Sequence, residues 1–560
     1  MVGEISKNFD ETIIHRRDND YMKDVVSISD FTKEEIISIL DCAQEIKDAK
    51  HDKKEADKFF YRYQKSIDEI LKGSRVASLF LENSTRTNFS SRSAAGQFGA
   101  FIDGFATIEN TSLKKGETWE QTLAMFAGYG FDSIVMRSPI EGMARWSVKA
   151  LVENQEHMIK ISKNLGLPYN YKRPFVINGG DGSNQHPTQC LLDLFTIREA
   201  ARSKGMDLDS GLDIALLNDL KYGRTNSSIM SVSPLFWFNL HLANPNRFEA
   251  DENKLKFLES RGVKITKYGE DFMSALEKAF VAYQSRPQKE RVAQGEDMSR
   301  LRKIGQINLE MYKQLAGKAP FLMHPLPIDA KTFMEISHDM RDHPLNITKL
   351  QSSNGIYIRA ALLALGYGSM ENKCSLEKRE GNDFSVIELE LTKDRRIKKL
   401  ENPRSGYIEG EGVVIDHIPM GMARRLAGIM GLEYEKISKN ITDYLPKRKG
   451  GDPVKDMIKI HANYRLSDKQ IEAIALLAPN ATISIIENSK VKEKYRGKIG
   501  CFVEERINCG NQKCVTNVDY EDVTSVHRSL GDGLYQCGYC EKFETLESIF
   551  NREGFNYIRI

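Results

Sequence analysis

The sequence predicts an α/β protein with two doubly wound parallel-sheet domains, followed by an α+β domain and a small cysteine-anchored domain. Three observations support this fold class. Short apolar runs between residues 75 and 327 end in polar, glycine or proline residues and are followed by helical patterns, as is typical of parallel strands joined by helices. Shorter strand-like and helix-like runs alternate after residue 405. Four cysteines are grouped near the end of the chain.

Six apolar runs are the candidate parallel strands, at 76–81, 133–136, 175–178, 214–218, 280–283 and 321–323. Each is followed by a side chain that could bind a ligand, in order Ser84, Arg137, His186, Arg224, Arg286 and His324. Ligands of open α/β sheets bind outside the carboxyl ends of the strands. We therefore expect these side chains to line one crevice.

Helical patterns are expected at 88–96, 191–201 and 354–366, with a solvated helical insertion near 50–72. The charged stretch 371–403 is expected to be a connector with one strand inside 384–391. Beyond it we expect strands at 413–415, 458–462 and 481–486 and helices at 421–430 and 467–477. A chain of 560 residues should contain roughly three or four domains of this kind.

The charge balance of the whole chain does not indicate any particular class of binding partner. The 80 basic and 78 acidic side chains nearly cancel, so neither nucleic acid nor an anionic membrane is indicated. The charged start of the chain lacks the apolar stretch of a signal peptide, and no run approaches the ~20 apolar residues that cross a bilayer. We expect a cytoplasmic protein whose scattered Cys42, Cys190, Cys374 and Cys501 are reduced thiols.

The first candidate site is an anion site at Ser84, Thr85, Arg86 and Thr87. These residues follow a strand and precede a helical pattern, so free backbone N–H groups would lie beside two kinds of side-chain donor, hydroxyl and guanidinium. A simple helix-capping sequence is the alternative. Arg137, after another strand, could supply a second planar set of donors.

His186 and Gln189 indicate carbonyl chemistry. An imidazole such as His186 can donate to an oxygen that gains negative charge, and the side-chain carbonyl of Gln189 can hold a neighbouring amine. Ser112 and Lys115 lie in a polar loop that, alone, is most simply a solvated turn.

The spacing of four cysteines, Cys509-x4-Cys514 and Cys537-x2-Cys540, suits one tetrahedral Zn²⁺ per chain. Four thiolates leave no open coordination position, so the ion would be structural and the segment zinc-ribbon-like. Free thiols are the alternative.

The motifs of the first part occur in an order that resembles aspartate carbamoyltransferase, over residues 26–366. The matching segments are 84–87, 114–118, 136–137, 181–189, 219–225, 288–291 and 324–327. The resemblance implies transfer of a carbamoyl group from carbamoyl phosphate to L-aspartate, an early step of pyrimidine biosynthesis, without a catalytic cofactor.

The resemblance also implies a role for each matching residue. Ser84, Thr85, Arg86 and Thr87 would hold the phosphate, and Arg137 would bridge phosphate and carbonyl. His186 would polarise the carbonyl oxygen, while Gln189 and the main-chain carbonyls of Pro325 and Leu326 would orient the carbamoyl amine. Arg224, Arg286 and Gln288 would bind the aspartate carboxylates. Ser112 and Lys115 would come from a neighbouring subunit, which implies a catalytic homotrimer or an assembly of trimers; Arg86, His186, Arg137 and Lys115 would be the catalytic residues.

Ornithine carbamoyltransferase is the nearest alternative family. It shares the phosphate motif but typically has Cys at the place of Pro325, and two arginines suit a dicarboxylate better than an ammonium side chain. The sequence departs from the aspartate family at Asn88 (usually Arg), Asn218 (usually Gly) and Ile328 (usually Arg).

Segments 414–419 and 455–460, together with the four cysteines, resemble the regulatory chain of the same enzyme, normally a separate polypeptide. This resemblance implies a nucleotide effector near Asp416, His417, Lys459 and Lys494. Glu409 and Glu411 place negative charge where the family has basic residues, and a domain that only braces the catalytic part is the alternative. The expected domains are 1–185 for carbamoyl phosphate, 186–345 for aspartate, 346–370 as a helix returning to the first domain, 371–405 as linker, 406–499 regulatory-like and 500–560 zinc-binding.

Three other functions were weighed. A nucleic-acid-binding zinc module is disfavoured because residues 501–560 hold six Lys/Arg against ten Asp/Glu, a balance of 6 − 10 = −4. A carbamoyltransferase with another amine acceptor is disfavoured because two arginines suit a dicarboxylate better than an ammonium side chain. A non-catalytic homologue that binds another enzyme is disfavoured because the chain keeps Arg86, Arg137, His186, Gln189, Arg224 and Arg286.

Overall fold

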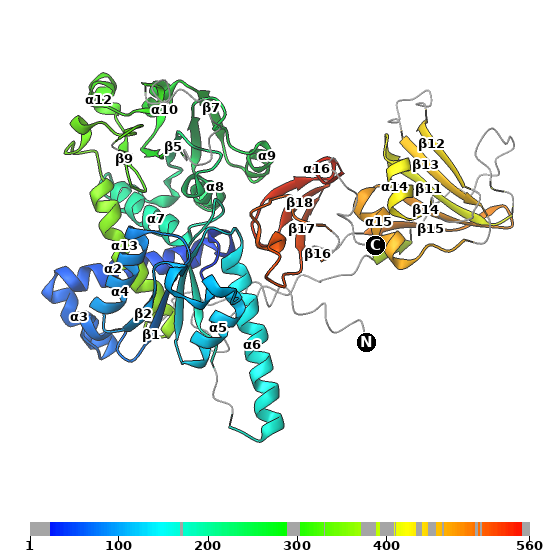
Figure 1. Cartoon of the computed structure of the whole chain (residues 1–560). Helices are drawn as coiled ribbons and strands as arrows, with labels where there is room; N and C mark the ends of the chain where they lie inside the picture. The colour runs from blue at the N-terminus through cyan, green and yellow to red at the C-terminus, as the bar shows by residue number, and fades with distance from the viewer. Residues whose placement is uncertain are drawn as a thin grey trace. The chain divides into compact units, whose positions relative to one another are not determined.

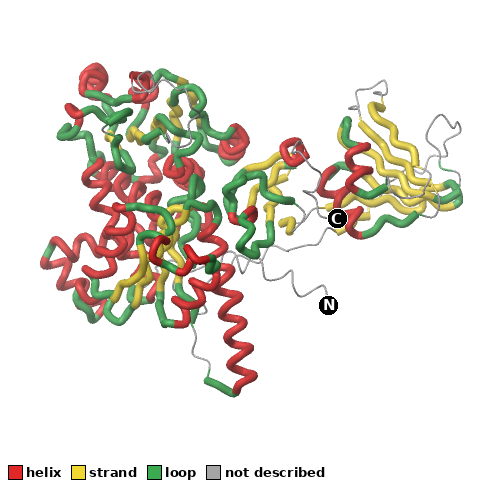
Figure 2. Tube along the Cα trace, in the orientation of Figure 1, coloured by secondary structure: helices red, strands yellow, loops and turns green. Residues whose placement is uncertain are grey.

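The protein consists of two compact units, one formed by residues 11–378 and the other by 379–560 with 1–10. The computed structural model describes residues 23–168, 172–287, 303–329, 331–370, 388–391, 408, 410–432, 439–445, 455–461, 464–498, 502–504, 507–531 and 533–550. The first unit contains helices and parallel strands, and the second contains mainly antiparallel strands (Figures 1 and 2). The predicted fold class is confirmed.

The first unit begins with a four-stranded parallel sheet in the order β2-β1-β3-β4. Its strands are β1 (Arg75–Phe80), β2 (Phe101–Phe105), β3 (Ser133–Ser138) and β4 (Phe175–Asp181). The three strands other than the edge strand β2 are almost wholly buried, because helices cover both faces of the sheet (Figure 1). The helices of this part are α2 (Lys33–His51), α3 (Lys53–Tyr63), α4 (Thr85–Gln97), α5 (Trp119–Gly128) and α6 (Met143–Leu165).

A second parallel sheet has five strands in the order β7-β6-β5-β8-β9. They are β5 (Asp213–Leu217), β6 (Asn239–Ala243), β7 (Ile265–Gly269), β8 (Val281–Gln284) and β9 (Phe321–Met323). Its helices are α8 (Arg224–Phe236), α9 (Glu252–Ser260), α10 (Phe272–Lys278) and α12 (Leu309–Leu315).

Two long helices tie the two sheets together. α7 (Pro187–Arg202) leads from the first sheet toward the second, and α13 (Thr348–Tyr367) packs against α2, α4 and α7. Nearly every residue of α7 is buried. One apolar core runs from β1 and α2 through α7 to β5 and β8, so the ligand-binding ends of both sheets are held by a common interior.

The second unit contains two antiparallel sheets. The larger has the order β10-β15-β14-β11-β13-β12 and the smaller β16-β17-β18-β19. Their elements are β10 (Glu388–Leu391), β11 (Gly412–Pro419), α14 (Ala423–Ile429), β12 (Lys439–Leu445), β13 (Lys455–His461), α15 (Asp468–Leu477), β14 (Thr482–Glu487), β15 (Lys490–Lys498), β16 (Phe502–Glu504), β17 (Val526–Gly531), β18 (Leu534–Cys537), β19 (Phe543–Thr545) and α16 (Leu546–Phe550). A shared core joins them, and the Tyr535 hydroxyl donates to the Leu476 carbonyl (3.1 Å).

The six predicted parallel strands are all present, as is the strand predicted inside 384–391. The strands predicted at 413–415, 458–462 and 481–486 correspond to β11, β13 and β14. Strands β2, β6 and β7 of the first unit, and β12 and β15 to β19 of the second, were not predicted. The insertion near 50–72 contains α3, which is solvated as expected, since Phe59 is the one buried side chain among the described residues of this helix. Ile70 and Leu71, at the end of the insertion, are buried. The rest of the connector 371–403 lies outside the described residues.

Candidate active site and metal centre

The carboxyl ends of both parallel sheets open onto one cleft of about 970 Å³ in the first unit. Twelve residues singled out in the sequence line it: Ser84, Thr85, Arg86, Thr87, Arg137, His186, Gln189, Arg224, Arg286, His324, Pro325 and Leu326. They come from the ends of β1, β3, β4, β5, β8 and β9. The placement follows from the topology, because parallel strands present their carboxyl ends at one edge of each sheet.

The floor of the cleft is the start of α4. Ser84 is the N-cap residue of this helix, yet its hydroxyl forms no capping hydrogen bond with the described backbone. The first backbone N–H groups of α4 are therefore available to an anion, and the positive end of the helix dipole favours one. The arrangement fits anion binding better than simple capping.

Two guanidinium groups approach each other deeper in the cleft. Arg137 donates from Nη1 to the Gly179 carbonyl (3.1 Å), and Arg224 donates from Nη1 to the Gly182 carbonyl (2.6 Å). The carboxylate of Glu82 lies 3.2 Å from Arg137 Nη2 and 3.7 Å from Arg224 Nη1. Glu82 thus partly neutralises two like charges, and any anionic ligand of these arginines has to compete with it.

Gly180 permits this close approach of the guanidinium groups. Its φ is +115°, and a Cβ at this position would lie 2.9 Å from Arg137 Nη1 and 3.3 Å from Arg224 Cζ. Another residue would meet both backbone strain and the two functional side chains. A glycine is therefore required for the geometry of the pair.

His186 is neutral in this environment. Burial, followed by the charges of Arg224, Arg137 and Arg359, holds its pKa well below the ordinary value. Its Nε2 lies 3.4 Å from Thr87 Oγ1 and its Nδ1 lies 3.3 Å from Thr188 Oγ1. A neutral imidazole offers one N–H, so His186 can donate to a developing oxyanion without acting as a general acid.

His324, which sequence reasoning did not assign a role, is also neutral. Burial and the charges of Arg86 and Arg286 lower its pKa to about 3. Its Nδ1 accepts from the backbone N–H of Leu326 (2.8 Å), which assigns the ring hydrogen to Nε2, a buried atom with no partner among the described residues. The ring therefore fixes the turn that carries the Pro325 and Leu326 carbonyls. The sequence signal that could have indicated a role for His324 is its position at the start of the 324–327 segment.

Three predicted residues are not part of the cleft as described. Ser112 and Lys115 lie in an exposed 3-10 turn, η5 (Ser112–Lys115), and do not line it. Gln288 lies outside the described residues. Glu82, in contrast, lines the cleft but was missed, because a carboxylate among cations carries no motif of its own.

The three departures from the family pattern each have a structural setting. Asn218 adopts φ +72°, which suits Asn among non-glycine residues, and its amide donates to the Ser285 and Gly305 carbonyls (3.2 and 3.1 Å). Asn88 is buried and reaches Ser78 Oγ (3.5 Å). Ile328 packs against the apolar core of the second sheet.

The second unit also gathers cations on one face of its larger sheet. Val414 on β11 pairs with Lys459 on β13 and with Ser484 on β14, and Ser484 pairs with Lys494 on β15, so these residues form one row across the sheet. Asp416 lies two residues further along the same face and forms an ion pair with Lys455 (2.9 Å). His417 contacts the same carboxylate (3.3 Å).

We call Asp416, His417, Lys455, Lys459, Lys494 and Arg496 the effector face. Lys455 and Arg496 were missed in the sequence. Strand alternation places Lys455, four residues from Lys459, and Arg496, two residues from Lys494, on the same face as those lysines. Burial lowers the pKa of His417 and so do Lys455, Lys494 and Arg496, while Asp416 raises it. The effector face is net positive, because its lysines and arginine outnumber its one carboxylate, Asp416. Of the two glutamates that oppose an anion, Glu411 is exposed and Glu409 lies outside the described residues.

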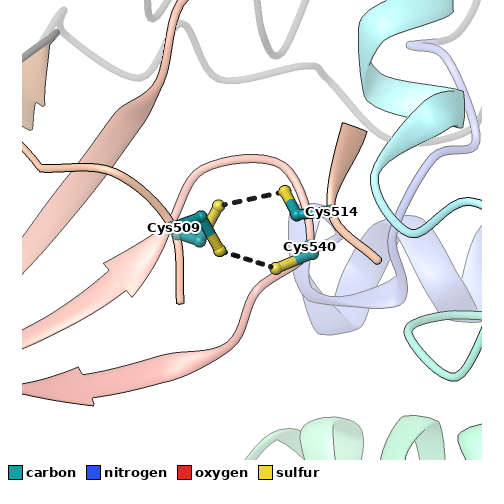
Figure 3. Close-up of side chains that lie close together, drawn as sticks. Cys509, Cys514 and Cys540 are labelled. Carbon is teal, nitrogen blue, oxygen red and sulfur yellow. Dashed lines mark hydrogen bonds between the residues drawn. The ribbon is translucent and has the colours of Figure 1, made fainter. Parts of the chain in front are cut away.

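The four predicted cysteines lie together: Cys537 is the last residue of β18, and the other three lie outside the strands of the smaller sheet. Figure 3 shows Cys509, Cys514 and Cys540. Cys509 Sγ is 3.5 Å from Cys540 Sγ, and Cys514 Sγ is 3.8 Å from Cys537 Sγ. These separations are far from a disulfide bond of about 2.05 Å. They match the edge of about 3.8 Å that follows from four Zn–S bonds of about 2.3 Å in a tetrahedron. The residues therefore fit one tetrahedral metal ion.

A buried histidine and glutamate lie beside this cluster. His527 Nε2 is 3.3 Å from Glu544 Oε2, both side chains are fully buried, and Glu544 Oε1 accepts from the Gly510 backbone N–H (2.9 Å). The ligating atoms of Cys509, His527 and Glu544 lie within 4.8 Å of one another. Sequence reasoning missed this pair, since His527 and Glu544 are separated along the chain and match no metal spacing.

The geometry of the first unit is that of a carbamoyl-transferring enzyme, and comparisons with known families agree. Residues 23–199 match the carbamoyl-phosphate-binding domain of aspartate/ornithine carbamoyltransferases, and 210–365 match their aspartate/ornithine-binding domain. Residues 408–498 match the allosteric domain of the aspartate carbamoyltransferase regulatory chain, and 502–550 match its metal-binding domain.

Two curated relatives narrow the assignment. The aspartate carbamoyltransferase catalytic subunit of Thermococcus kodakarensis is 35% identical over 62% of this chain and 97% of its own length. Protein PyrBI of Treponema denticola is 28% identical over 88% of this chain and 92% of its own length. A solved structure of the M. jannaschii aspartate transcarbamoylase catalytic subunit is 31% identical, with a TM-score of 0.49, over 61% of this chain and 97% of that one. The chain belongs to the aspartate carbamoyltransferase family, with catalytic and regulatory parts in one polypeptide.

None of the helices in the described ranges is both long enough and apolar enough to cross a membrane.

Proposed function

We propose that the cleft transfers the carbamoyl group of carbamoyl phosphate to the amine of L-aspartate, giving N-carbamoyl-L-aspartate and phosphate. The observation that carries this proposal is the convergence of an open helix start, four arginines (Arg86, Arg137, Arg224 and Arg286) and a neutral imidazole in one cleft. The neutral aspartate amine would attack the carbonyl carbon, and the carbonyl electrons would move onto the oxygen. Their return would break the carbon–oxygen bond to phosphate, and the departing phosphate would take up the proton that the amine nitrogen loses.

Each part of the cleft has a distinct task in this proposal. Ser84, Thr85, Arg86 and Thr87 hold the phosphate at the start of α4. Arg137 reaches both phosphate and carbonyl oxygen, and His186 donates its single N–H to that oxygen. Gln189 and the Pro325 and Leu326 carbonyls accept from the carbamoyl amine. Positioning and charge stabilisation then lower the barrier without a side-chain nucleophile.

Arg224 and Arg286 would bind the two carboxylates of aspartate, with Gln288 beside them. Both arginines line the same cleft. Arg224 is the first residue of α8, and Arg286 follows Ser285 just after the end of β8. A guanidinium pairs with a carboxylate through two parallel hydrogen bonds, so two of them select a dicarboxylic acceptor. This favours aspartate over amine acceptors with a cationic side chain.

Ser112 and Lys115 would complete the site of a neighbouring subunit in a catalytic homotrimer or an assembly of trimers. The support is their exposure on η5, outside the cleft of their own chain. Mixing inactive Arg86→Ala and Lys115→Ala chains tests this: shared sites restore activity in mixed oligomers, whereas separate sites do not.

Arg86→Ala tests the phosphate site, with carbamoyl aspartate and phosphate release as the readout. Removing a charge partner of the transition state typically costs ~3 kcal/mol or more, so turnover should fall by about two to three orders of magnitude. Arg92→Ala, a change of the same kind further along α4, is the control. Near-normal turnover of Arg86→Ala would refute the assignment.

We propose further that the metal held by Cys509, Cys514, Cys537 and Cys540 is one structural Zn²⁺ per chain. Their sulfur separations and the closed donor set support zinc in a purely structural role. Metal analysis of the full chain should give one zinc, and chelation should unfold the smaller sheet while the parallel sheets remain folded. Zinc-free protein with an ordered smaller sheet would exclude the proposal.

The effector face would bind a nucleoside triphosphate and thereby regulate carbamoyl transfer in the cleft. The protein would be cytoplasmic, where such effectors are abundant. The row of lysines across β13 and β15 supports it. Calorimetry with ATP and CTP, in parallel with carbamoyl-transfer assays, tests binding and regulation separately.

A further inference from the structure

Asp193 is a buried carboxylate directly behind the cleft that neither the motifs nor the proposed function uses. It lies on α7, one turn after Gln189, and is completely shielded from solvent. Burial raises its pKa to about 7 although four groups oppose this: Tyr283, Gln351, Gln189 and the charge of Arg359. A group this costly to bury needs a compensating role.

All three hydrogen bonds of Asp193 are accepted from groups connected to the cleft. Gln189 Nε2 donates to Oδ1 (2.9 Å), Gln351 Nε2 donates to the same oxygen (2.7 Å), and the Tyr283 hydroxyl donates to Oδ2 (2.7 Å). These donors come from three different elements, α7, α13 and β8.

The first of these bonds fixes the orientation of the Gln189 side chain. A carboxamide can turn by 180° and exchange its oxygen and nitrogen. Because the Gln189 NH₂ is held by Asp193, its oxygen is the atom left to accept from a ligand. Without the carboxylate, the amide could present its NH₂ to the carbamoyl amine, and two donors would face each other.

The second bond reaches the other two acceptors of the proposed site. Gln351 donates to Asp193 and accepts, through Oε1, from the backbone N–H of His324 (2.9 Å). His324 Nδ1 in turn accepts from the Leu326 N–H, which sets the turn bearing the Pro325 and Leu326 carbonyls. Asp193 is thus connected to every group that accepts from the carbamoyl amine in the proposed function.

We propose that Asp193 is a positioning residue that aligns the three acceptors of the carbamoyl amine, and so lets the enzyme select a carbamoyl over an acyl phosphate. The inference rests on the proposed function of Gln189, Pro325 and Leu326. It concerns selectivity for an –NH₂ group over a methyl group of similar size, and this distinguishes it from a merely structural role.

Carbamoyl phosphate and acetyl phosphate are the matched probes, since they differ in that group alone. Their dissociation constants are measured by calorimetry on the full-length protein, which does not depend on turnover. Wild type should prefer carbamoyl phosphate. Asp193→Ala and Gln189→Ala should both reduce this preference by about tenfold or more, because each misaligned hydrogen bond is worth roughly 1 kcal/mol and several are affected.

Two variants control for folding. Asp193→Asn should retain the preference to within about threefold, because its oxygen can still accept from both glutamines while its NH₂ faces the adaptable Tyr283 hydroxyl. Asp41→Ala removes the ion pair of Asp41 with Arg198, also on α7 (2.7 Å), and should lower the melting temperature without changing the preference.

The outcomes separate the inference from the proposed function. A reduced preference in Gln189→Ala but not in Asp193→Ala would overturn the inference and leave the function intact. An unchanged preference in both would remove the amine assignment and the inference with it. If Asp193→Ala does not fold, Gln351→Met, which cuts the link to His324 at similar volume, decides: a reduced preference supports the inference and an unchanged one overturns it.

Discussion

The catalytic cleft and the effector face both group cations around one carboxylate, but they hold those cations differently. In the cleft, Arg137 and Arg224 are 8% and 18% exposed and each donates to a backbone carbonyl. On the effector face, Lys455 is 32% exposed and its acidic partner is a single side chain, Asp416. Buried, tethered guanidinium groups fix the position of a ligand, whereas lysines on a sheet face mainly supply charge. Substitutions in the cleft should therefore reduce activity strongly. Substitutions on the effector face should reduce ligand affinity only mildly and in a salt-dependent way.

After Arg86→Ala, the largest effect we expect in this comparison comes from His186→Ala. Loss of a donor to the developing oxyanion typically lowers kcat by about 100-fold. Because burial, Arg224 and Arg137 keep the His186 pKa well below its ordinary value, the ring donates as a neutral group. His186→Asn, which keeps an N–H donor, should therefore be markedly more active than His186→Ala. In the wild type, titration of His186 should cause no change in activity above pH 7. Equal activity of the two variants would mean that His186 acts in another way.

Gly180→Ala should come next, with a loss of about tenfold in kcat/KM. A Cβ here meets Arg137 Nη1 at 2.9 Å, and well-placed charge partners lose much of their effect when shifted by an ångström. Gly205→Ala is the matched control, because Gly205 also has a positive φ (+70°) but open space around its Cβ position. A comparable loss in both variants would attribute the effect to backbone strain rather than to the arginine pair.

The difference between the two sites also explains what sequence reasoning could reach. The cleft residues follow apolar runs, so the topology of parallel strands gathers them without knowledge of any contact. Strands β2 and β7 were missed because they are sheet edges with partly exposed residues, and β6 because no ligand-binding motif follows it.

The remaining functional residues were missed because they act through partners that are distant in the sequence. The carboxylates Glu82 and Asp193 and the pair His527–Glu544 act through partners up to 158 residues away, and none belongs to a local pattern. On the effector face, strand alternation alone would have found Lys455 and Arg496. The four cysteines, in contrast, were identified by spacing because one ion imposes both their number and their separation.

Replacement of His527 should weaken the metal centre while leaving the cleft unaffected. The buried His527–Glu544 pair lies against Cys509 and holds the backbone of Gly510 in place, and partners behind metal ligands typically contribute about 10-fold or more to metal affinity. His527→Leu should therefore lose zinc to a chelator at about tenfold lower chelator concentration. His461→Leu, at the end of β13, serves as the control, and an unchanged chelator titration in His527→Leu would assign the pair to packing alone.

Lys494→Gln should reduce nucleotide affinity only several-fold. Exposed ion pairs are typically worth about 0.2–1 kcal/mol and are screened by salt, so the difference from wild type should shrink as ionic strength rises. Lys492→Gln, on the same strand as Lys494, removes the ion pair of Lys492 with Glu487 (2.7 Å) and is the control. Calorimetry at low and high salt measures both, and a large, salt-independent loss would show that the face fixes geometry as the cleft does.

The smallest effect, of about twofold to fivefold, should follow Asp416→Asn, and its sign depends on the ligand. Removing the carboxylate lowers the pKa of His417 further, since Asp416 is the group that raises it, and frees Lys455 from its ion pair. Inorganic tripolyphosphate should then bind more tightly, while a nucleoside triphosphate should gain less if the carboxylate also accepts from base or ribose. NMR titration of His417 and paired calorimetry of the two ligands measure these changes. Weaker binding of tripolyphosphate would show that Asp416 organises the cations instead of competing for them, and the effector face would then resemble the cleft, where Glu82 lies between two arginines.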